Sequence, residues 1–188
     1  MRRLACCLAL VPALAFAQDP LPVTFLPGGA GQDGCYAQWS TRSAVRAYSA
    51  PTPQSEPIRT VDADRRIDAN DYSESLTAVL QPGLVRAQRP VTIEAYRTGA
   101  ESAETVRLSL NDELQILGNA GEGTQYFAFG TAVYAGLVPG YSGGDGVEVV
   151  RRPVTELWVR LTERGPDRPA AWVNTAQAGM AEREAFCG

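Results

Sequence analysis

The chain contains no histidine and no lysine, and all 17 of its basic residues are arginine. Without an imidazole or a side-chain amine it cannot form a Ser-His-Asp triad, a Cys-His pair, a lysine Schiff base or a phosphate-loop lysine. Histidine metal ligands are excluded for the same reason. Any catalysis would have to use carboxylates, hydroxyls or cysteine, which excludes most hydrolase and transferase mechanisms.

Concentrated positive charge is also missing. The formal net charge is −4, and acidic and basic residues are interspersed along the chain. Beyond the N-terminus the only basic doublets are Arg65-Arg66 and Arg151-Arg152. A protein that neutralises several phosphates needs a dense arginine or lysine face. We therefore expect no nucleic-acid partner and no binding to an anionic membrane surface.

Only one long apolar run is present, and it lies at the N-terminus. Met1-Arg2-Arg3 is followed by apolar residues from Leu4 to Phe16, and Ala15-Phe16-Ala17 has the small-x-small pattern of a signal-peptidase site. The run is shorter than the roughly 20 residues needed to cross a bilayer. We expect residues 1–17 to be a cleaved signal peptide, no membrane span, and a mature protein in the periplasm or secreted.

Cysteine is scarce, with four residues in the chain. Cys6 and Cys7 belong to the predicted leader, which leaves Cys35 and Cys187 near the two ends of the mature chain. In an oxidising compartment such a pair is expected to form a disulfide. A redox-active pair usually has CxxC spacing, which is absent, so the structural role is favoured. Whether the bond closes within one chain is left open.

The mature chain is expected to be all-β. Residues 18–34 predict an irregular lead-in rich in proline and glycine, and short segments with period-two alternation follow. Asn111-Asp112 is a predicted turn between strands at 106–110 and 113–118. A short C-terminal helix is expected over 175–184. Further strands are predicted at 43–48, 57–61, 83–87, 91–96, 124–129, 131–137, 147–151, 154–161 and 170–174.

A weak internal repeat raises the possibility of two modules. Residues 77–85 are similar to residues 131–138, and each copy is followed by Arg-Pro-Val-Thr, at 89–92 and at 152–155. If the repeat is real, it indicates β modules in tandem. The predicted division is a β module over 35–90 and a second over 91–188.

The C-terminal part resembles bacterial SH3-like domains. Glu156-Leu157-Trp158-Val159-Arg160-Leu161, a turn, and Ala171-Trp172-Val173 are similar to the closing hairpin of that family, and residues 108–117 are similar to an earlier segment of it. Asn111-Asp112 and Ala171 stand where that family usually has glycine. The resemblance spans about residues 91–174. It implies a small five-stranded barrel that binds peptide or cell-wall material through aromatic-lined loops. Together with the repeat, it predicts one or two small SH3-like barrels, in tandem if the repeat is real.

Aromatic side chains are the candidate binding residues. Phe127, Phe129 and Trp158 are expected in the core, because burial is the default for aromatic residues in strands. Four others are predicted at a ligand-binding rim, where an amphipathic ring can hold peptide or sugar. These are Tyr126, Tyr134, Tyr141 and Trp172, with residues 141–146 as a loop beside them.

Carboxylates offer two further hypotheses. The acidic run between Asp62 and Glu74 could hold calcium, but its spacing fails the EF-hand pattern and a solvated loop is the better interpretation. Paired carboxylates could hydrolyse glycosides without histidine. The candidates for such a pair are Glu94, Glu113, Glu122 and Glu156. Because no convergent motif is visible, we expect no catalytic residue, no metal and no cofactor.

These observations favour a non-enzymatic, exported binding protein of the bacterial cell envelope. Its expected partner is an envelope protein, a peptide or peptidoglycan. Two alternatives stay open: a carboxylate-dependent hydrolase acting on envelope polysaccharide, and a secreted enzyme inhibitor that presents the loop over 139–146.

Overall fold

The computed structural model describes residues 24–27, 35–52, 54–68, 70–162 and 170–187. The predicted leader (1–17) and most of the predicted lead-in (18–34) lie outside these residues. Sixteen strands and no helix occur in the described part, so the all-β prediction is confirmed. The described residues also contain no helix with the length and apolarity needed to cross a bilayer.

The strands form three sheets. The six-stranded sheet has the order β1 (Thr24–Pro27), β6 (Tyr72–Gln81), β14 (Val154–Leu161), β15 (Ala171–Asn174), β3 (Val45–Tyr48) and β4 (Pro57–Val61). The seven-stranded sheet has the order β13 (Val147–Arg151), β7 (Gly83–Ala87), β10 (Glu113–Gly121), β11 (Thr124–Phe129), β12 (Ala132–Gly136), β8 (Val91–Arg97) and β9 (Ala103–Leu108). The three-stranded sheet has the order β16 (Met180–Cys187), β2 (Cys35–Thr41) and β5 (Arg66–Ile67).

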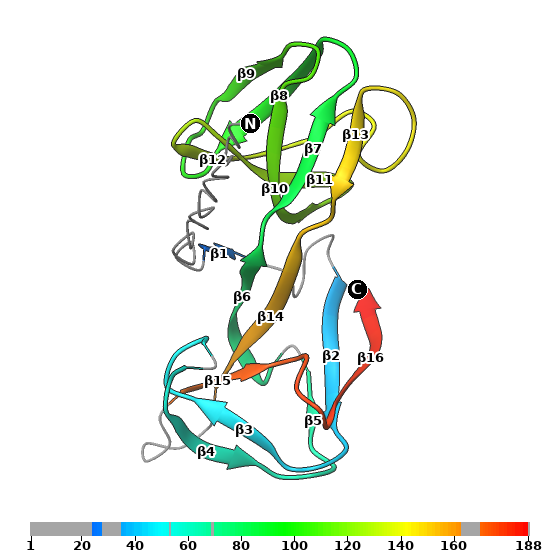
Figure 1. Ribbon diagram of the computed structural model, residues 1–188. Coiled ribbons are helices and arrows are strands. Elements are labelled where there is room, and N and C mark those ends of the chain that lie inside the picture. Colours follow the sequence, from blue (N-terminus) through cyan, green and yellow to red (C-terminus); the bar gives the residue numbers. More distant parts are fainter. Residues whose placement is uncertain (1–23, 28–34, 53, 69, 163–169, 188) are drawn as a thin grey trace, which may run out of the picture.

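The molecule is elongated, with two lobes joined by a pair of strand connections (Figure 1). We call residues 83–151 the insert lobe, because the seven-stranded sheet is built from this one continuous segment. The split lobe consists of residues 24–81 and 154–187, which form the other two sheets. One polypeptide segment is therefore inserted between the two halves of the other lobe.

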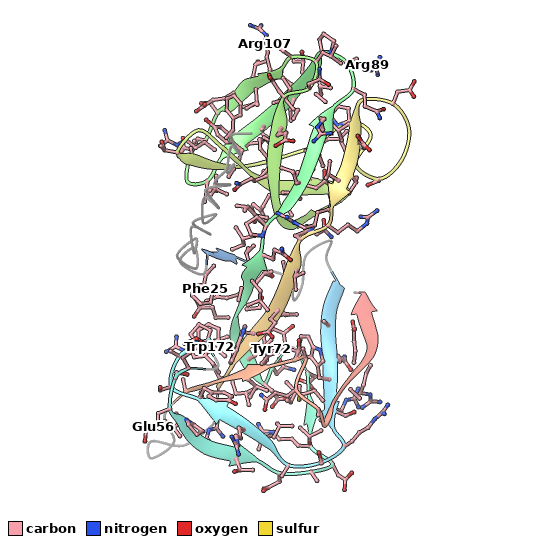
Figure 2. All side chains as sticks on the ribbon, viewed as in Figure 1. Phe25, Glu56, Tyr72, Arg89, Arg107 and Trp172 are labelled. Carbon is pink, nitrogen blue, oxygen red and sulfur yellow. The ribbon has the colours of Figure 1, made fainter. Side chains whose placement is uncertain are left out.

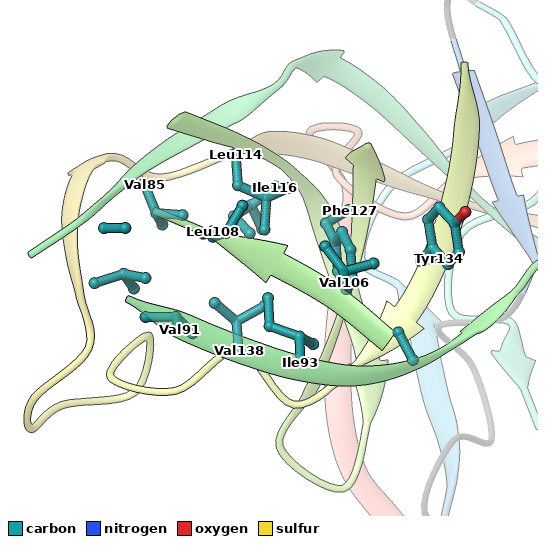
Figure 3. Close-up of a cluster of buried hydrophobic side chains, with 13 residues drawn as sticks. Val85, Val91, Ile93, Val106, Leu108, Leu114, Ile116, Phe127, Tyr134 and Val138 are labelled. Atoms are coloured by element: carbon teal, nitrogen blue, oxygen red, sulfur yellow. The ribbon is translucent and has the colours of Figure 1, made fainter. Parts of the chain in front are cut away.

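Alternating side chains build the core of the insert lobe. In β8, Val91, Ile93 and Ala95 are buried while the residues between them are exposed, as their period-two spacing predicts. Side chains from the other strands meet them in the interior of the curled sheet, Phe127 and Ile116 among them (Figure 3). Each large aliphatic or aromatic side chain buried in this way contributes about 1.5–3 kcal/mol.

A tight turn ends the alternation between β9 and β10. Asn111 has a φ of 69°, a left-handed conformation that asparagine tolerates, and the Ser109 amide donates to Asp112 Oδ2 at 2.7 Å. The predicted turn at 111–112 is confirmed. The strand was expected to run over 106–110, but Leu110 lies beyond its end and is 56% exposed. That expectation is wrong because the strand ends at Leu108 and Leu110 belongs to the turn.

The split lobe is a sandwich of the six-stranded and three-stranded sheets. Its core lies between them and contains Trp39 and Ile67 from the small sheet and Val159, Leu161 and Val173 from the large one. In the small sheet β2 pairs antiparallel with β16, the last strand of the chain. The lobe is thus closed by strand pairs between segments that are far apart in the sequence.

Two connections form a narrow waist between the lobes. β6 continues through Pro82 into β7, and β13 continues through residues 152–153 into β14. The Arg151 guanidinium donates from Nε and Nη2 to the Pro82 carbonyl oxygen, at 3.1 and 2.9 Å. A Cβ on Gly83 would lie 2.7 Å from Pro153 Cδ, so only glycine fits this close approach.

An apolar contact joins the lobes beside the waist. Leu26 and Val79 of the split lobe pack in one cluster with Leu117 of the insert lobe, and the half-buried Tyr126 packs against it. A Cβ added at Gly118 would lie 3.3 Å from Leu26 Cδ1. We call this cluster the joint. Its contacts hold the lobes together in addition to the two connections.

The C-terminal segment differs from the prediction. Residues 175–184 were expected to be helical, but 175–179 form a turn and β16 begins at Met180. The Ala176 amide donates to Asn174 Oδ1 at 2.8 Å, and Gly179 has a φ of 108° that a helix does not allow. Pairing with β2 then decides the strand conformation, because β16 gains a ladder of backbone hydrogen bonds.

The segments that resemble SH3-like domains lie in different sheets. Residues 108–117 extend from the end of β9 into β10 in the seven-stranded sheet, whereas β14 and β15 belong to the six-stranded sheet. In the described part of the chain none of the sheets closes into a barrel. The SH3-like resemblance itself stays a prediction. The module boundary predicted near residue 90 falls between β7 and β8, within the insert lobe.

Candidate functional site

Two of the four aromatic residues predicted at a binding rim are buried. Tyr134 is 8% exposed; its ring stacks on Phe127 with centroids 5.7 Å apart, and its hydroxyl donates to Glu104 Oε2 at 3.1 Å. Burial, reinforced by the Glu104 hydrogen bond, raises the pKa of Tyr134 above its usual value. Trp172 is also 8% exposed and packs with Trp158 in the split lobe. These two rings therefore belong to different cores.

Tyr126 lies at the joint. Its half-buried side chain packs against Leu26, Val79 and Leu117, and this burial raises the pKa of Tyr126. The residue contributes to the contact between the lobes. Of the expected core residues, Phe127 and Trp158 are fully buried, whereas Phe129 at the end of β11 is 41% exposed.

Tyr141 is the predicted residue that lies in a pocket. It follows β12 in the loop over residues 137–146, and the Arg152 guanidinium carbon lies 5.5 Å from the centroid of its ring. A cation above a tyrosine face is attracted by the negative charge of the ring face. Since Tyr141 belongs to the insert lobe and Arg152 to the waist, this contact places a loop of one lobe over the strand connection.

We call the open pocket around these residues the waist pocket. It has a volume of about 470 Å³ and is lined by the β10–β11 turn, the Tyr141 loop and the start of β14. Its lining residues are Gly118, Asn119, Glu122, Gly123, Gln125, Tyr141, Ser142, Arg152, Pro153 and Thr155.

A two-residue turn places the Glu122 carboxylate at this pocket. Glu122 and Gly123 connect β10 to β11 with φ angles of 48° and 76°, and positive values at both positions are typical of a type I′ hairpin turn. The Gly121 amide donates to Asn119 Oδ1 at 3.1 Å, and Thr124 Oγ1 donates to the Gly121 carbonyl oxygen at 2.5 Å. The turn is therefore fixed by local hydrogen bonds.

Gln125 connects this turn to the Tyr141 loop. Its side chain is 4% exposed, donates from Nε2 to the Gly123 carbonyl oxygen at 2.6 Å, and accepts at Oε1 from the Val138 amide at 3.2 Å. A buried amide with both ends bonded holds its neighbours in one geometry. Gln125 was not predicted, because nothing in the sequence marks one glutamine as buried.

The base of the Tyr141 loop is closed by glycines. Cβ atoms added at Gly140 and Gly146 would lie 2.8 Å from the Val147 amide nitrogen and 2.5 Å from the Pro139 carbonyl oxygen. The Gly146 carbonyl oxygen accepts from the Gln88 amide at 2.9 Å. The loop is therefore anchored to the insert lobe at its base.

The chemistry of the waist pocket suits polar recognition. Arg152 supplies five fixed N–H donors, Glu122 supplies a carboxylate, and Ser142 and Thr155 add hydroxyls that donate or accept. Among the described residues Arg152 has the Tyr141 ring as a neighbour and no carboxylate partner. Its donors can therefore bind an acceptor on a ligand.

The other carboxylates proposed for a hydrolytic pair lie outside this pocket. Glu94 accepts from Thr105 Oγ1 at 3.0 Å, and Glu156 accepts from Asn174 Nδ2 at 2.7 Å. Glu113 pairs with Arg86 at 2.8 Å, and this hydrogen bond and charge raise the pKa of Arg86. Since Glu94 and Glu113 project from the insert lobe and Glu156 from β14, the four glutamates do not share one cavity.

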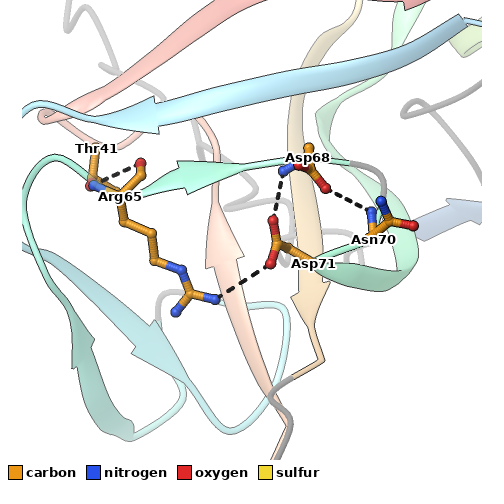
Figure 4. Close-up of polar contacts among 5 residues, drawn as sticks. All are labelled: Thr41, Arg65, Asp68, Asn70 and Asp71. Atoms are coloured by element: carbon orange, nitrogen blue, oxygen red, sulfur yellow. Dashed lines mark hydrogen bonds and ion pairs between the residues drawn. The ribbon is translucent and has the colours of Figure 1, made fainter.

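The acidic run includes β5 and the start of β6, and its residues 65–71 make local polar contacts (Figure 4). Asp71 Oδ2 accepts from the Asp68 amide at 3.0 Å, and Asp68 Oδ1 accepts from the Asn70 amide at 3.0 Å. Asp71 Oδ1 also lies 3.9 Å from Arg65 Nη2. The described residues contain no group of His, Cys, Asp and Glu side chains arranged to hold a metal ion. The carboxylates of Asp68 and Asp71 therefore bond to nearby backbone amides.

The predicted disulfide partners lie opposite each other in the backbone. Cys35 of β2 and Cys187 of β16 are register partners in the antiparallel pair. Directly opposed residues have Cα atoms about 4.5–5.5 Å apart, within the range that a disulfide spans. Their side chains lie outside the described residues, so the disulfide stays a prediction that the register supports.

The chain matches no protein-family model, no curated protein and no solved structure.

Proposed function

We propose that this chain is an exported, non-enzymatic binding protein of the bacterial cell envelope, and that it recognises peptide, protein or cell-wall material at the waist pocket. The proposal depends on one observation: Arg152, Glu122 and Tyr141 line a single pocket to which the insert lobe and the waist both contribute. Peptides and peptidoglycan fragments carry both carboxylates and hydrogen-bond donors, which these side chains complement.

Binding is favoured over hydrolysis by the number of carboxylates. Of the lining residues of the waist pocket, Glu122 is the one with an acidic side chain. Glycoside hydrolysis in its common forms needs two carboxyl groups on either side of the bond. The anchored loop over 139–146 borders the same pocket, so a protein partner could also be bound there.

The proposal is tested by titrating the isotope-labelled mature protein with soluble peptidoglycan fragments. Amide shifts are expected in residues 118–125, 141–142 and 152–155. Arg152→Ala should weaken binding about tenfold or more, because a hydrogen bond to a charged group contributes about 1.5–3 kcal/mol. Arg107→Ala is the matched control, since Arg107 is exposed at the far end of the insert lobe (Figure 2).

Other outcomes separate the alternatives. Shifts confined to other regions, or equal weakening by both arginine variants, would contradict the assignment of this pocket. Release of cleaved glycan that disappears in Glu122→Gln would indicate the hydrolase. A tight complex with an envelope enzyme that is lost when residues 141–145 are deleted would indicate the inhibitor.

A further inference from the structure

A second pocket lies on the joint, between β1 and the insert lobe. It has a volume of about 290 Å³ and is lined by Phe25 and Leu26 of β1 and by residues 97–98 and 131–133. We call it the edge pocket. None of its lining residues lines the waist pocket.

Among the described residues, the strand at this pocket is paired along one edge only. β1 pairs with β6 in antiparallel register, with Phe25 opposite Ala78, and it is the last strand on that side of the six-stranded sheet. Half of the N–H and C=O groups of an edge strand point away from its neighbour and can pair with another strand. Neighbouring side chains on a strand point to opposite faces. Phe25 and Leu26 point to opposite faces and both line the pocket, so the pocket extends around one edge of β1. Because β6 pairs with the other edge, the pocket adjoins the edge that no described strand pairs with.

The side chains divide into an apolar floor and one cationic end. Phe25 is 40% exposed at the pocket, whereas Leu26 is buried in the joint (Figure 2 labels Phe25). Ala132 and Val133 continue the apolar surface. The single charged residue of the lining is Arg97, which is exposed at the end of β8.

Arg97 is available to an anion. Among the described residues it takes part in no ion pair. The neighbouring Thr98 amide donates to the Val133 carbonyl oxygen at 2.8 Å, which fixes the end of β8 against the start of β12. A guanidinium presented in this way binds a carboxylate in a bidentate geometry.

We infer that the edge pocket binds the C-terminal end of an extended peptide. The peptide backbone adds to the edge of β1 that the pocket adjoins, its last apolar side chain contacts Phe25, and its terminal carboxylate pairs with Arg97. This combines strand addition with capture of a C-terminal carboxylate, two modes by which proteins recognise peptides. The inference goes beyond the proposed function, because it concerns a separate pocket.

The probe that tests it is a fluorescent hexapeptide of valine and threonine that ends in phenylalanine, made as the free acid and as the C-terminal amide. The free acid should bind the mature protein about tenfold more tightly than the amide, since the amide lacks the charge that Arg97 recognises. Amide shifts should appear in residues 24–26, 97–98 and 131–133.

Arg97→Gln gives the decisive comparison. It should abolish the preference for the free acid, whereas Arg107→Gln should leave the preference unchanged. The preference is a ratio measured within one variant, so a general change in stability does not imitate the result. Arg152→Ala should also leave the preference intact, which separates this inference from the proposed function. Phe25→Ala should weaken both peptides.

Several results would overturn the inference. These are equal binding of acid and amide, a preference that survives Arg97→Gln, and the absence of binding at millimolar peptide. Competitive binding of myristate without binding of either peptide would assign the pocket to fatty acids and would also overturn it.

Discussion

The two lobes bury similar apolar cores but assemble them differently. In the insert lobe the hairpins β8–β9, β10–β11 and β11–β12 join strands that follow one another in the chain. In the split lobe β2 pairs with β16, and β15 pairs with β3, across most of the sequence. Closing a short hairpin costs little conformational entropy, whereas pairing strands that are distant in the sequence closes a long loop and costs more. Hairpins therefore supply a larger share of the strand pairing in the insert lobe, whereas the split lobe depends more on long-range contacts.

Of the changes considered, excision of the insert lobe should alter the structure most, because it separates the two lobes. Leu84 is paired with Arg151 in the insert lobe, and Gln81 is paired with Val154 in the split lobe. Cutting both connections at the waist therefore leaves the two new ends of each lobe next to each other. We expect residues 82–152 to fold alone and the split lobe to fold when a short glycine-serine turn replaces them. Dispersed amide spectra of the two fragments would confirm this. An unfolded insert fragment would show instead that the joint is required for its stability.

The predicted disulfide should stabilise one lobe selectively. Cys35→Ser is expected to lower the free energy of unfolding of the split lobe by about 4–5 kcal/mol, the chain-entropy value for so long a loop. Hydrogen exchange in the insert lobe should not change. Cys187→Ser should give the same loss, and the double variant no more. Intact mass under non-reducing conditions gives a direct check, because two alkylatable thiols would contradict the bond.

Replacing Gly83 at the waist should lower the stability of both lobes. Gly83→Ala places a Cβ 2.7 Å from the Pro153 backbone nitrogen, and we expect a loss of about 1–3 kcal/mol from forced movement of the two connections. Gly118→Ala is the matched control, since its Cβ meets the end of the Leu26 side chain at 3.3 Å. Denaturant unfolding of both variants measures the difference. Equal losses would show that the waist is no tighter than the joint.

Alkaline pH should also lower the free energy of unfolding of the insert lobe, by less than the substitutions above. The pKa of Tyr134 is raised by burial and by its hydrogen bond to Glu104. In the unfolded chain tyrosine titrates near pH 10. The stabilisation is complete below about pH 10 and is lost as the pH rises from there through the raised pKa, because the unfolded state releases its proton first. Thermal unfolding of the insert lobe should show this decline, and Tyr134→Phe should make it shallower. Identical pH profiles would contradict the assignment.

The strands that the sequence predicted well are bounded by turns and alternate cleanly. The predicted ranges 57–61, 83–87, 124–129, 147–151 and 154–161 match the structure at both ends. β6 was missed because its burial does not alternate: Ala78 and Val79 are both buried, on opposite faces, as the strand passes the joint. With two adjacent buried residues and intermediate or exposed residues elsewhere, β6 has no period-two pattern to detect.

The candidate site was predicted less well than the fold. Tyr141 was identified, but Tyr134 and Trp172 lie in cores, each beside a buried aromatic residue on the neighbouring strand, Phe127 and Trp158. Arg152 was visible in the sequence as part of a basic doublet before proline. Its position beside the Tyr141 ring is visible only in the tertiary structure.

Local chemistry and tertiary contacts thus determine different properties of this protein. The sequence alone excludes imidazole and lysine chemistry, predicts an all-β chain and locates the Asn111 turn, because these depend on residue type and on spacing over a few residues. Only the tertiary structure decides that residues 83–151 are inserted between β6 and β14, and that two pockets flank the joint. Those features depend on pairing between distant strands, and period-two alternation identifies the apolar face of a strand but not its partner.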